Sequence, residues 1–345
     1  MNLFSIKKYT TLITMILSIT IIVACAGTEE NTDGPTTTSI LLNSSPDANH
    51  VGIFLAQEKG YFTEENITVT INTTPTGQSE IINSVINGTN DFGIIGQLDL
   101  LKAIDDGKQI KGITAINQNS LHALVSLKDS SKIESPKDLI GKQVGYPGTI
   151  YSEKLLETML ITEGVQLNEV NLINNGEEVD SALINGEVDV IVTENWPKLK
   201  SKLNIAGKEH TIIQFTGWAV PEYYELVLIT TKETTEKKEN FTKRFVKALR
   251  RGYEDSINDT GSAVQAMINQ NSNIEFDANL ENEYAKNLIE TWKPFRPVRG
   301  ARIPLYGDQD ANIYQVLIRW MRKHQLVGST VNYADAYLNK FNLNE

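Results

Sequence analysis

From residue 39 onward, short apolar runs alternate with amphipathic segments. The run at 39–43 (SILLN) is typical of a strand, and the segment at 50–59 places apolar residues on one helical face before Gly60 ends it. The alternation continues with expected strands at 67–72, 91–96 and 111–116 and expected helices at 79–86 and 98–106. Strands separated by helices form βαβ units. The pattern therefore predicts an α/β fold with a mostly parallel sheet covered by helices.

A second alternating unit follows the first. Its expected strands are 124–127, 143–146, 170–173, 188–192, 212–215 and 225–230, its expected helices are 152–162 and 179–184, and Ser135 with Pro136 and Asp138 marks a further helix start. From Lys237 the chain becomes helical and charged, with helices expected at 313–323 and in a last segment through 334–341. We expect two lobes, lobe one formed by 39–122 and 226–345 and lobe two by the inserted segment 123–225. Two chain crossings then make a hinge, and a cleft between such lobes is a preferred site for small molecules.

Charge and cysteine content exclude several classes of function. The 345 residues carry a net charge of −11, and nucleic acid binding requires clustered Lys and Arg instead. Cys25 is the only cysteine, and the four histidines are scattered, so we expect no disulfide framework, no metal site and no redox cofactor.

The first 25 residues have the pattern of an export signal. Lys7 and Lys8 precede an apolar run, 12–24, of about 13 residues, which is shorter than the ~20 that a membrane-spanning helix needs. The run ends at Ile-Val-Ala-Cys25, the pattern of a bacterial lipobox with cleavage before Cys25 and lipid on its sulfur; the alternative is an ordinary signal peptide with an incidental cysteine. We therefore predict a signal peptide at 1–24, lipidation of Cys25, a flexible tether at 25–38 and an extracytoplasmic monomer anchored by lipid to the bacterial cell membrane.

No catalytic motif stands out. The chain lacks the Gly-x-Ser-x-Gly elbow, the phosphate-binding Gly-x-x-x-x-Gly-Lys-Ser/Thr loop, the dinucleotide Gly-x-Gly-x-x-Gly and the His-Glu-x-x-His zinc motif. The turn from Gly145 to Gly148 at a strand-to-helix junction is suited to present backbone amides to a cleft, or is simply a tight turn that needs glycine. Nothing in the sequence requires an enzyme.

Several strings resemble the thiamine-pyrimidine-binding proteins of bacterial ABC importers. They are Pro-Asp-Ala-Asn-His-Val-Gly at 46–52, Ala-Gln-Glu-Lys-Gly-Tyr-Phe at 56–62, Gly-Lys-Gln-Val-Gly-Tyr-Pro-Gly at 141–148 with Glu153 downstream, and Val-Pro-Glu-Tyr-Tyr-Glu-Leu-Val at 220–227. The Glu-Lys-Gly-Tyr-Phe string is shared with sulfonate, nitrate and riboflavin binders, whereas the first and last strings point to the pyrimidine group. The resemblance covers about 39–345. It implies a two-lobed periplasmic-binding-protein fold of type II, which the yeast pyrimidine synthases share.

The chain departs from this family at two places. The family usually has a tryptophan just before the Pro-x-x-Asn-His string, where it stacks on the pyrimidine, and here the matching stretch is 43–45 (NSS). After the strand that ends at Val192, the family has an aromatic-Asn-x-Glu string, and here the chain reads Thr-Glu-Asn-Trp-Pro. Trp218 is our candidate for the missing aromatic face.

The predicted ligand-binding residues are of three kinds. Polar groups for a ring edge are Asn49, His50 and Gln97, although capping, a place in the first helical turn and a solvated loop are the respective alternatives. Flat faces for a heteroaromatic ring come from Tyr146, Tyr151, Trp196, Trp218, Tyr223 and Tyr224, of which some must pack the lobes, with Gly148 beside them. Glu194 and Glu225 are candidate carboxylates for an exocyclic amine, or plain surface charges. We assign structural roles to His122, His210 and His324.

The sequence therefore predicts a binding lipoprotein that delivers a ligand to the permease and ATPase subunits of an ABC importer. The expected ligand is a thiamine-precursor aminopyrimidine of the hydroxymethylpyrimidine or formylaminopyrimidine type. The alternative within this class is riboflavin or an aromatic or alkyl sulfonate. The alternative from another class is a pyrimidine synthase like those of yeast, which sacrifice their own histidine; His50 has a similar Asn-His context, but the body lacks the cysteine-rich motif of those enzymes.

Overall fold

The computed structural model describes residues 35–73, 77–129, 133–294 and 304–342. The predicted signal peptide and Cys25 lie outside these ranges. Within the described residues, no helix combines the length and the apolar character that crossing a membrane would require.

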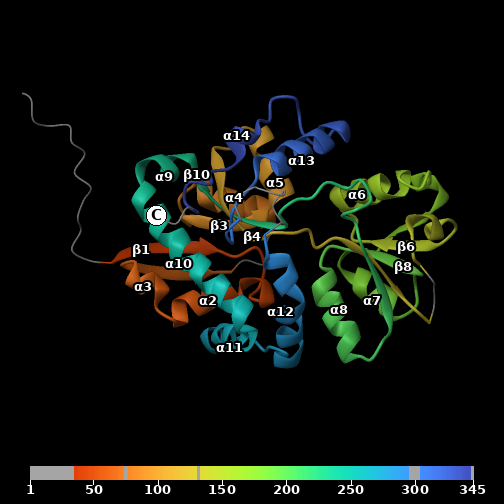
Figure 1. The fold of residues 1–345 in the computed structure, drawn as a ribbon, viewed down its shortest axis with the longest axis horizontal. Coiled ribbons are helices and arrows are strands. Elements are labelled where there is room, and N and C mark those ends of the chain that lie inside the picture. Colours follow the sequence, from red (N-terminus) through yellow and green to blue (C-terminus); the bar gives the residue numbers. More distant parts are fainter. Residues whose placement is uncertain (1–34, 74–76, 130–132, 295–303, 343–345) are drawn as a thin grey trace, which may run out of the picture. The chain divides into compact units, whose positions relative to one another are not determined.

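Five strands form the first sheet (Figure 1). They are β1 (Thr36–Leu41), β2 (Ile67–Asn72), β3 (Phe92–Gly96), β4 (Ile110–Asn117) and β10 (Leu226–Thr231), in the order β2-β1-β3-β10-β4. β1 runs parallel to β3, whereas β10 runs antiparallel to both β3 and β4, with Leu228 opposite Ile94 and Thr114. The sheet is thus mixed rather than mostly parallel, because β10 enters it from the second sheet in the reverse direction.

The second sheet has the same number of strands. They are β5 (Ala123–Leu127), β6 (Gln143–Tyr146), β7 (Asn171–Asn174), β8 (Val190–Thr193) and β9 (His210–Gln214), in the order β7-β6-β8-β5-β9. β6 is parallel to β7 and β8, and β5 is antiparallel to β8 and β9. The chain passes between the sheets at 118–122 and at 215–225. The α/β class is confirmed. The described residues from Thr37 onward form one compact unit, and the lobe boundaries stay a prediction.

The first strand starts earlier than the sequence predicts. β1 begins at Thr36, so 36–38 belong to the sheet rather than to the tether. The side chain of Asp91 holds this end of the strand, since Oδ2 accepts from the Thr38 hydroxyl at 2.9 Å and from the Ser39 amide at 3.1 Å.

Helices connect and cover the strands. The helices between the strands of the first sheet are η1 (Ala48–His50), α2 (Val51–Glu58), α3 (Tyr61–Glu64), α4 (Gln78–Ile86) and α5 (Gln97–Asp105). The helices between the strands of the second sheet are η2 (Pro136–Leu139), α6 (Ile150–Ile161), η3 (Leu167–Glu169), η4 (Gly176–Glu178), α7 (Val179–Ile184) and α8 (Trp196–Ile205). The chain then forms α9 (Lys232–Lys237), α10 (Glu239–Asn258), α11 (Thr260–Gln270), α12 (Ala278–Trp292), α13 (Ala311–Lys323) and α14 (Tyr333–Ala336).

Two helix assignments differ from the sequence predictions. We predicted no helix at α8. Its cap is the Asn195 side chain, which accepts from the Lys198 amide at 3.2 Å, and Pro197 lies in its first turn. The last helical segment, expected to extend through 334–341, is only the short α14. On α8, Trp196, Leu199 and Leu203 are buried at helical spacing, whereas the short α14 has no long apolar face, which is the signal that helix prediction relies on.

Candidate functional site

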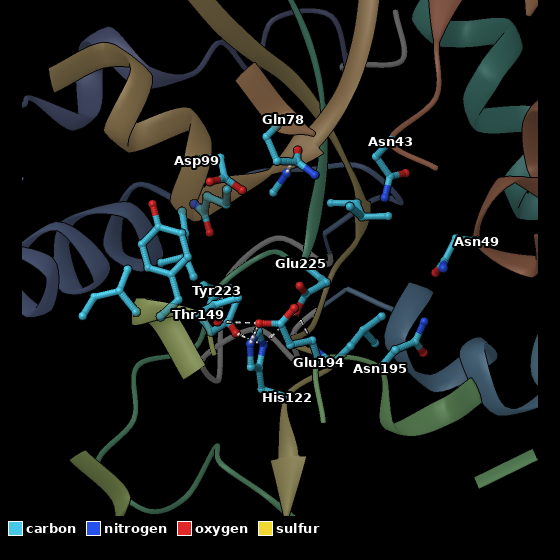
Figure 2. Close-up of a pocket in the computed structure, with 17 residues that line it drawn as sticks. Asn43, Asn49, Gln78, Asp99, His122, Thr149, Glu194, Asn195, Tyr223 and Glu225 are labelled. Carbon is cyan, nitrogen blue, oxygen red and sulfur yellow. Dashed lines mark hydrogen bonds and ion pairs between the residues drawn. The ribbon is translucent and has the colours of Figure 1, made fainter. Parts of the chain in front are cut away.

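A cavity of about 410 Å³ lies where the two sheets and the two passages between them meet (Figure 2). Its lining includes six of the predicted site residues, namely Asn49, Gln97, Tyr151, Glu194, Tyr223 and Glu225. It also includes six polar residues that we did not predict from the sequence, namely Asn43, Gln78, Asp99, His122, Thr149 and Asn195.

The topology explains why these side chains meet. Gln97 begins α5 directly after β3, Thr149 caps α6 after β6, and Glu194 follows β8. The carboxyl ends of strands and the starts of the following helices gather at one edge of an α/β sheet. His122 and Glu225 end the two passages between the sheets, so they enter the same space from the hinge side.

His122 occupies the centre of the polar lining. Its ring is buried, with Nε2 3.6 Å from Glu194 Oε1, Nδ1 3.6 Å from Glu225 Oε2, and the Tyr223 hydroxyl 2.7 Å from Nδ1. Burial by itself lowers the pKa of His122, but the carboxylates of Glu194 and Glu225 raise it to about 10. We therefore describe His122 as an imidazolium held between two carboxylates. From the sequence we assigned His122 a structural role only; its position beside an expected passage between the lobes was the signal for a site.

Glu194 is the cavity carboxylate that accepts hydrogen bonds from two hydroxyl groups. Its Oε1 accepts from the hydroxyls of Thr149 and Ser152 at 2.7 Å each. Burial by itself raises the pKa of Glu194, but His122 and these hydroxyls lower it to about 2. Its side chain is still 41% exposed, so an ionised oxygen is open to a ligand. Glu225 is anchored by the Leu121 amide at 2.8 Å and is more enclosed.

Asp99 faces these two carboxylates from α5. Burial, followed by the charges of Glu225 and Glu194, raises the pKa of Asp99 to about 6, against a contact with the Tyr151 hydroxyl. Burial, followed by the charge of Asp99, also raises the pKa of Tyr151. Within the described lining, the ionisable side chains besides Tyr151 and Tyr223 are three carboxylates and one histidine, with no lysine or arginine.

Gln97 supplies a buried amide. Its Oε1 accepts from the Tyr224 backbone amide at 2.8 Å, while its Nε2 is buried without a hydrogen-bond partner. An unpaired buried donor is costly, and a ligand acceptor would relieve that cost.

Asn49 and His50 are both buried, and their surroundings differ. Asn49 lines the cavity, but the cap of η1 is Asp47, whose side chain accepts from the Asn49 amide at 3.0 Å; the capping alternative for Asn49 is wrong. His50 does not line the cavity in the described residues: Nδ1 accepts from the Asp47 amide at 3.2 Å and Nε2 lies 2.8 Å from Asn43 Oδ1. Asn43 belongs to the stretch where this chain lacks the family's tryptophan, and it lies between His50 and the cavity.

The remaining predicted residues lie elsewhere. They are Tyr146, Gly148, Trp196, Trp218 and Tyr224, and none is part of the described cavity lining. Trp196 is buried in the core of the second sheet, Tyr224 hydrogen-bonds to the Asp310 amide at 2.7 Å, and Trp218 packs on a core cluster. Gly148 has φ +79°, and a Cβ there would lie 2.5 Å from the Asn174 side chain, so the turn itself requires glycine. The described residues contain no group of histidine, cysteine and carboxylate side chains suited to hold a metal ion.

Comparison with known proteins connects this geometry to a family. The family described as NMT1/THI5 like matches residues 47–263. The chain is 26% identical over 334 residues to the formylaminopyrimidine-binding protein of Halalkalibacterium halodurans, covering 94% of this chain and 97% of that protein. It is 27% identical over 151 residues to a 4-amino-5-hydroxymethyl-2-methylpyrimidine phosphate synthase of Saccharomyces cerevisiae, covering 44% of each.

The fold is that of a periplasmic binding protein, as the sequence resemblance predicts. The crystal structure of the periplasmic aliphatic sulphonate-binding protein of Escherichia coli superposes with a TM-score of 0.67 at 13% identity, covering 87% of this chain and 97% of that one. At this identity the match supports the fold and carries no information on the ligand.

Proposed function

The chain belongs to the NMT1/THI5-like family, and from this premise we propose that it is the binding protein of an ABC importer that takes up a thiamine-precursor aminopyrimidine. The near full-length match to a formylaminopyrimidine-binding protein supports a binding role. In this proposal the ligand occupies the cavity around His122, and the loaded protein docks on the permease.

The acidic lining of the cavity is the observation that carries the proposal. Asp99, Glu194 and Glu225 offer hydrogen-bond acceptors, and His122 neutralises only part of their charge. An aminopyrimidine brings amine donors to such carboxylates and a ring nitrogen that can accept from Gln97 Nε2. Tyr151 supplies an aromatic ring at the same wall.

The same lining argues against an anionic ligand. A sulfonate would be placed among three carboxylates without a lysine or arginine in the described lining. Like charges at such short range repel strongly in a partly desolvated cavity. The fold therefore supports the sulfonate alternative, but the charges of the lining do not. Riboflavin has both hydrogen-bond acceptors and donors and remains an alternative ligand.

The synthase alternative rests on His50 and lacks support from its surroundings. A sacrificed histidine must be reached by the reacting groups, yet His50 is fully buried and contacts Asp47 and Asn43 with its two ring nitrogens. The match to the yeast synthase is also partial. We therefore propose a binding protein without catalysis, lipid-anchored through Cys25 on the outer face of the cell membrane.

Isothermal titration calorimetry tests the ligand. We expect saturable binding of 4-amino-5-hydroxymethyl-2-methylpyrimidine or its formylamino relative at pH 7.5, with no heat from an alkyl sulfonate of similar size. Glu194→Gln removes one charged acceptor and is expected to weaken binding about tenfold. The control Glu209→Gln changes an exposed carboxylate on the surface and should leave the dissociation constant unchanged. Binding of the sulfonate in preference to the pyrimidine would overturn the proposal.

A further inference from the structure

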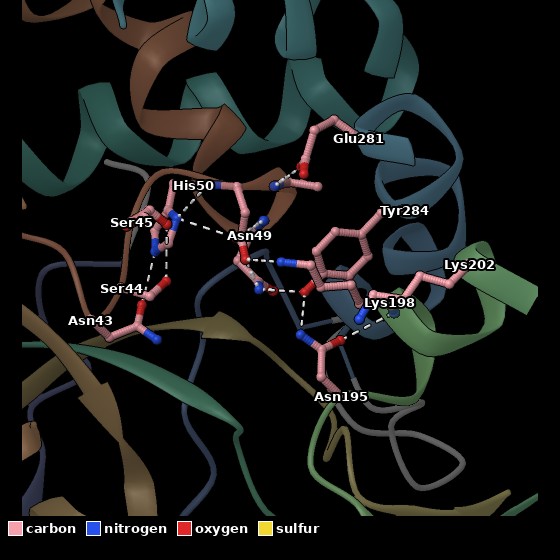
Figure 3. A network of polar contacts seen from close by, with 12 residues as sticks. Asn43, Ser44, Ser45, Asn49, His50, Asn195, Lys198, Lys202, Glu281 and Tyr284 are labelled. Carbon is pink, nitrogen blue, oxygen red and sulfur yellow. Dashed lines mark hydrogen bonds and ion pairs between the residues drawn. The ribbon is translucent and has the colours of Figure 1, made fainter. Parts of the chain in front are cut away.

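Two asparagines of the cavity lining converge on one hydroxyl outside that lining (Figure 3). Asn49 Nδ2, from η1, and Asn195 Nδ2, from the start of α8, each lie 2.5 Å from the Tyr284 hydroxyl oxygen. Tyr284 lies on α12 and is fully buried. Because η1 accompanies the first sheet and α8 the second, this hydroxyl joins the two sides of the cavity.

The other partners of the two asparagines determine the direction of these bonds. Asn49 Oδ1 accepts from Asn117 Nδ2 at 2.8 Å, so its amide nitrogen faces Asp47 and Tyr284. Asn195 Oδ1 accepts from the Lys198 amide at 3.2 Å, so its nitrogen also faces Tyr284. The tyrosine oxygen is therefore the acceptor in both bonds, which fills both of its lone pairs.

An ion pair supports the same junction. Lys198 Nζ, on α8, lies 3.4 Å from Asp47 Oδ2, on the segment that caps η1. Burial raises the pKa of Asp47, but contacts with His50 and the charge of Lys198 lower it to about 2. The two sides of the cavity are therefore connected directly by this pair and indirectly through Tyr284.

We propose that Tyr284 is a positioning residue for ligand binding, acting as a clamp that holds Asn49 and Asn195 in place and favours the closed arrangement of the cavity. This inference rests on the proposed function only in assuming that the cavity binds a ligand. When the two sides separate, water replaces the shared acceptor. When the two sides close in a protein that lacks the Tyr284 hydroxyl, Asn195 Nδ2 has lost the hydrogen-bond acceptor that it has in the structure.

Tyr284→Phe isolates the hydroxyl because the ring and its packing remain. We expect a dissociation constant about tenfold higher for 4-amino-5-hydroxymethyl-2-methylpyrimidine, arising from faster dissociation with little change in the association rate. Stopped-flow measurement of both rates tests this. The matched control is Tyr306→Phe, which removes the buried hydrogen bond from the Tyr306 hydroxyl to the Ile116 carbonyl oxygen (2.8 Å). Both residues belong to the core of the first sheet and lie outside the described cavity lining, so both rates should be unchanged.

A second measurement needs no ligand. Spin labels at Thr63 and Glu163, both exposed and on opposite sides of the cavity, report the separation of the sides by double electron–electron resonance in the full chain carrying Cys25→Ser. We expect Tyr284→Phe to shift the ligand-free distances towards longer values and Tyr306→Phe to leave them unchanged. Superposable distributions for wild type and Tyr284→Phe would overturn the clamp. If the wild-type protein bound no aminopyrimidine, the proposed function would be wrong. The distance distributions of wild type and Tyr284→Phe would still test the clamp.

Discussion

His122 Nε2 lies 3.6 Å from Glu194 Oε1, and this ion pair connects the first passage between the sheets with the end of β8. Glu225, on the second passage, lies at the same distance from Nδ1. One imidazolium thus holds both passages and the rim of the second sheet together. The arrangement couples the two passages to the residues that line the cavity.

Removing the imidazolium should destabilise the protein in a pH-dependent way. The pKa of His122 is raised to about 10, so its contribution is complete below about pH 6.5 and is lost as the pH rises through 10. The pKa of Glu194 is lowered to about 2, so its contribution is complete above about pH 4.5 and is lost as the pH falls through 2. His122→Leu is therefore expected to lower the free energy of unfolding most between pH 4.5 and 6.5.

The loss should be about 1–2 kcal/mol at pH 6, below the range for a fully buried pair because the Glu194 side chain is 41% exposed. Urea unfolding at pH 6 and pH 10 measures it. His210→Gln, at a half-buried position on β9, serves as the control and should show little difference at either pH. A loss of equal size at both pH values would mean that the leucine disturbs packing rather than charge.

Asp99 should have the opposite effect on stability. The pKa of Asp99 is raised to about 6, by burial and then by Glu225 and Glu194, so its ionised form destabilises the folded state. That penalty is complete above about pH 6 and absent below about pH 3.8. Asp99→Asn is expected to raise the free energy of unfolding by about 2 kcal/mol at pH 7.5 and by almost nothing at pH 4. The exposed Asp129→Asn should change it at neither pH; an unchanged Asp99→Asn at pH 7.5 would contradict the raised pKa.

Much of the architecture follows from local sequence, and so does part of the site. Apolar alternation gave the strands β2 and β6 with their observed bounds, because each strand lies between a clear turn and an amphipathic helix. Gln97 was selected as the residue after a buried strand, and Glu194 and Glu225 as carboxylates for an exocyclic amine; all three line the cavity.

The rest of the site depends on contacts between distant parts of the chain. His122 resembles any buried histidine until Glu194 and Glu225 are placed beside it, and Asp99 resembles an ordinary residue in the first turn of a helix. Trp196 and Trp218 show the opposite case: both were predicted from their place near a motif, and both pack on core clusters instead of lining the described cavity. Sequence spacing alone does not distinguish these cases.

The aromatic wall of the cavity offers a further test. Tyr151 lines the cavity, whereas Trp218 does not, so the stacking role predicted for Trp218 fits Tyr151 better. Tyr151→Ala is expected to weaken binding of the aminopyrimidine by about 1–2 kcal/mol through lost ring contact. Trp218→Ala, measured by the same titration, should change the dissociation constant less than about twofold. The reverse ranking of the two variants would return the stacking role to Trp218.

The packing of α10 on α2 depends on glycine at the contact. A Cβ built on Gly252 would lie 2.0 Å from the Gly52 carbonyl oxygen and 2.7 Å from Ala56 Cβ, so the two helix backbones have no room for a methyl group. Gly252→Ala is expected to lower the free energy of unfolding by about 3 kcal/mol, since overpacking forces the helices apart.

Gly261 on α11 provides the matched control for that substitution. Its Cβ would meet only side-chain oxygens at 3.6 Å or more, so the methyl group fits. Alanine also has the higher helix propensity, and Gly261→Ala should stabilise the protein by up to about 1 kcal/mol. Thermal unfolding of the two variants beside wild type measures both changes. Equal effects of the two substitutions would mean that helix propensity, and not the close approach of α10 to α2, determines the requirement for glycine.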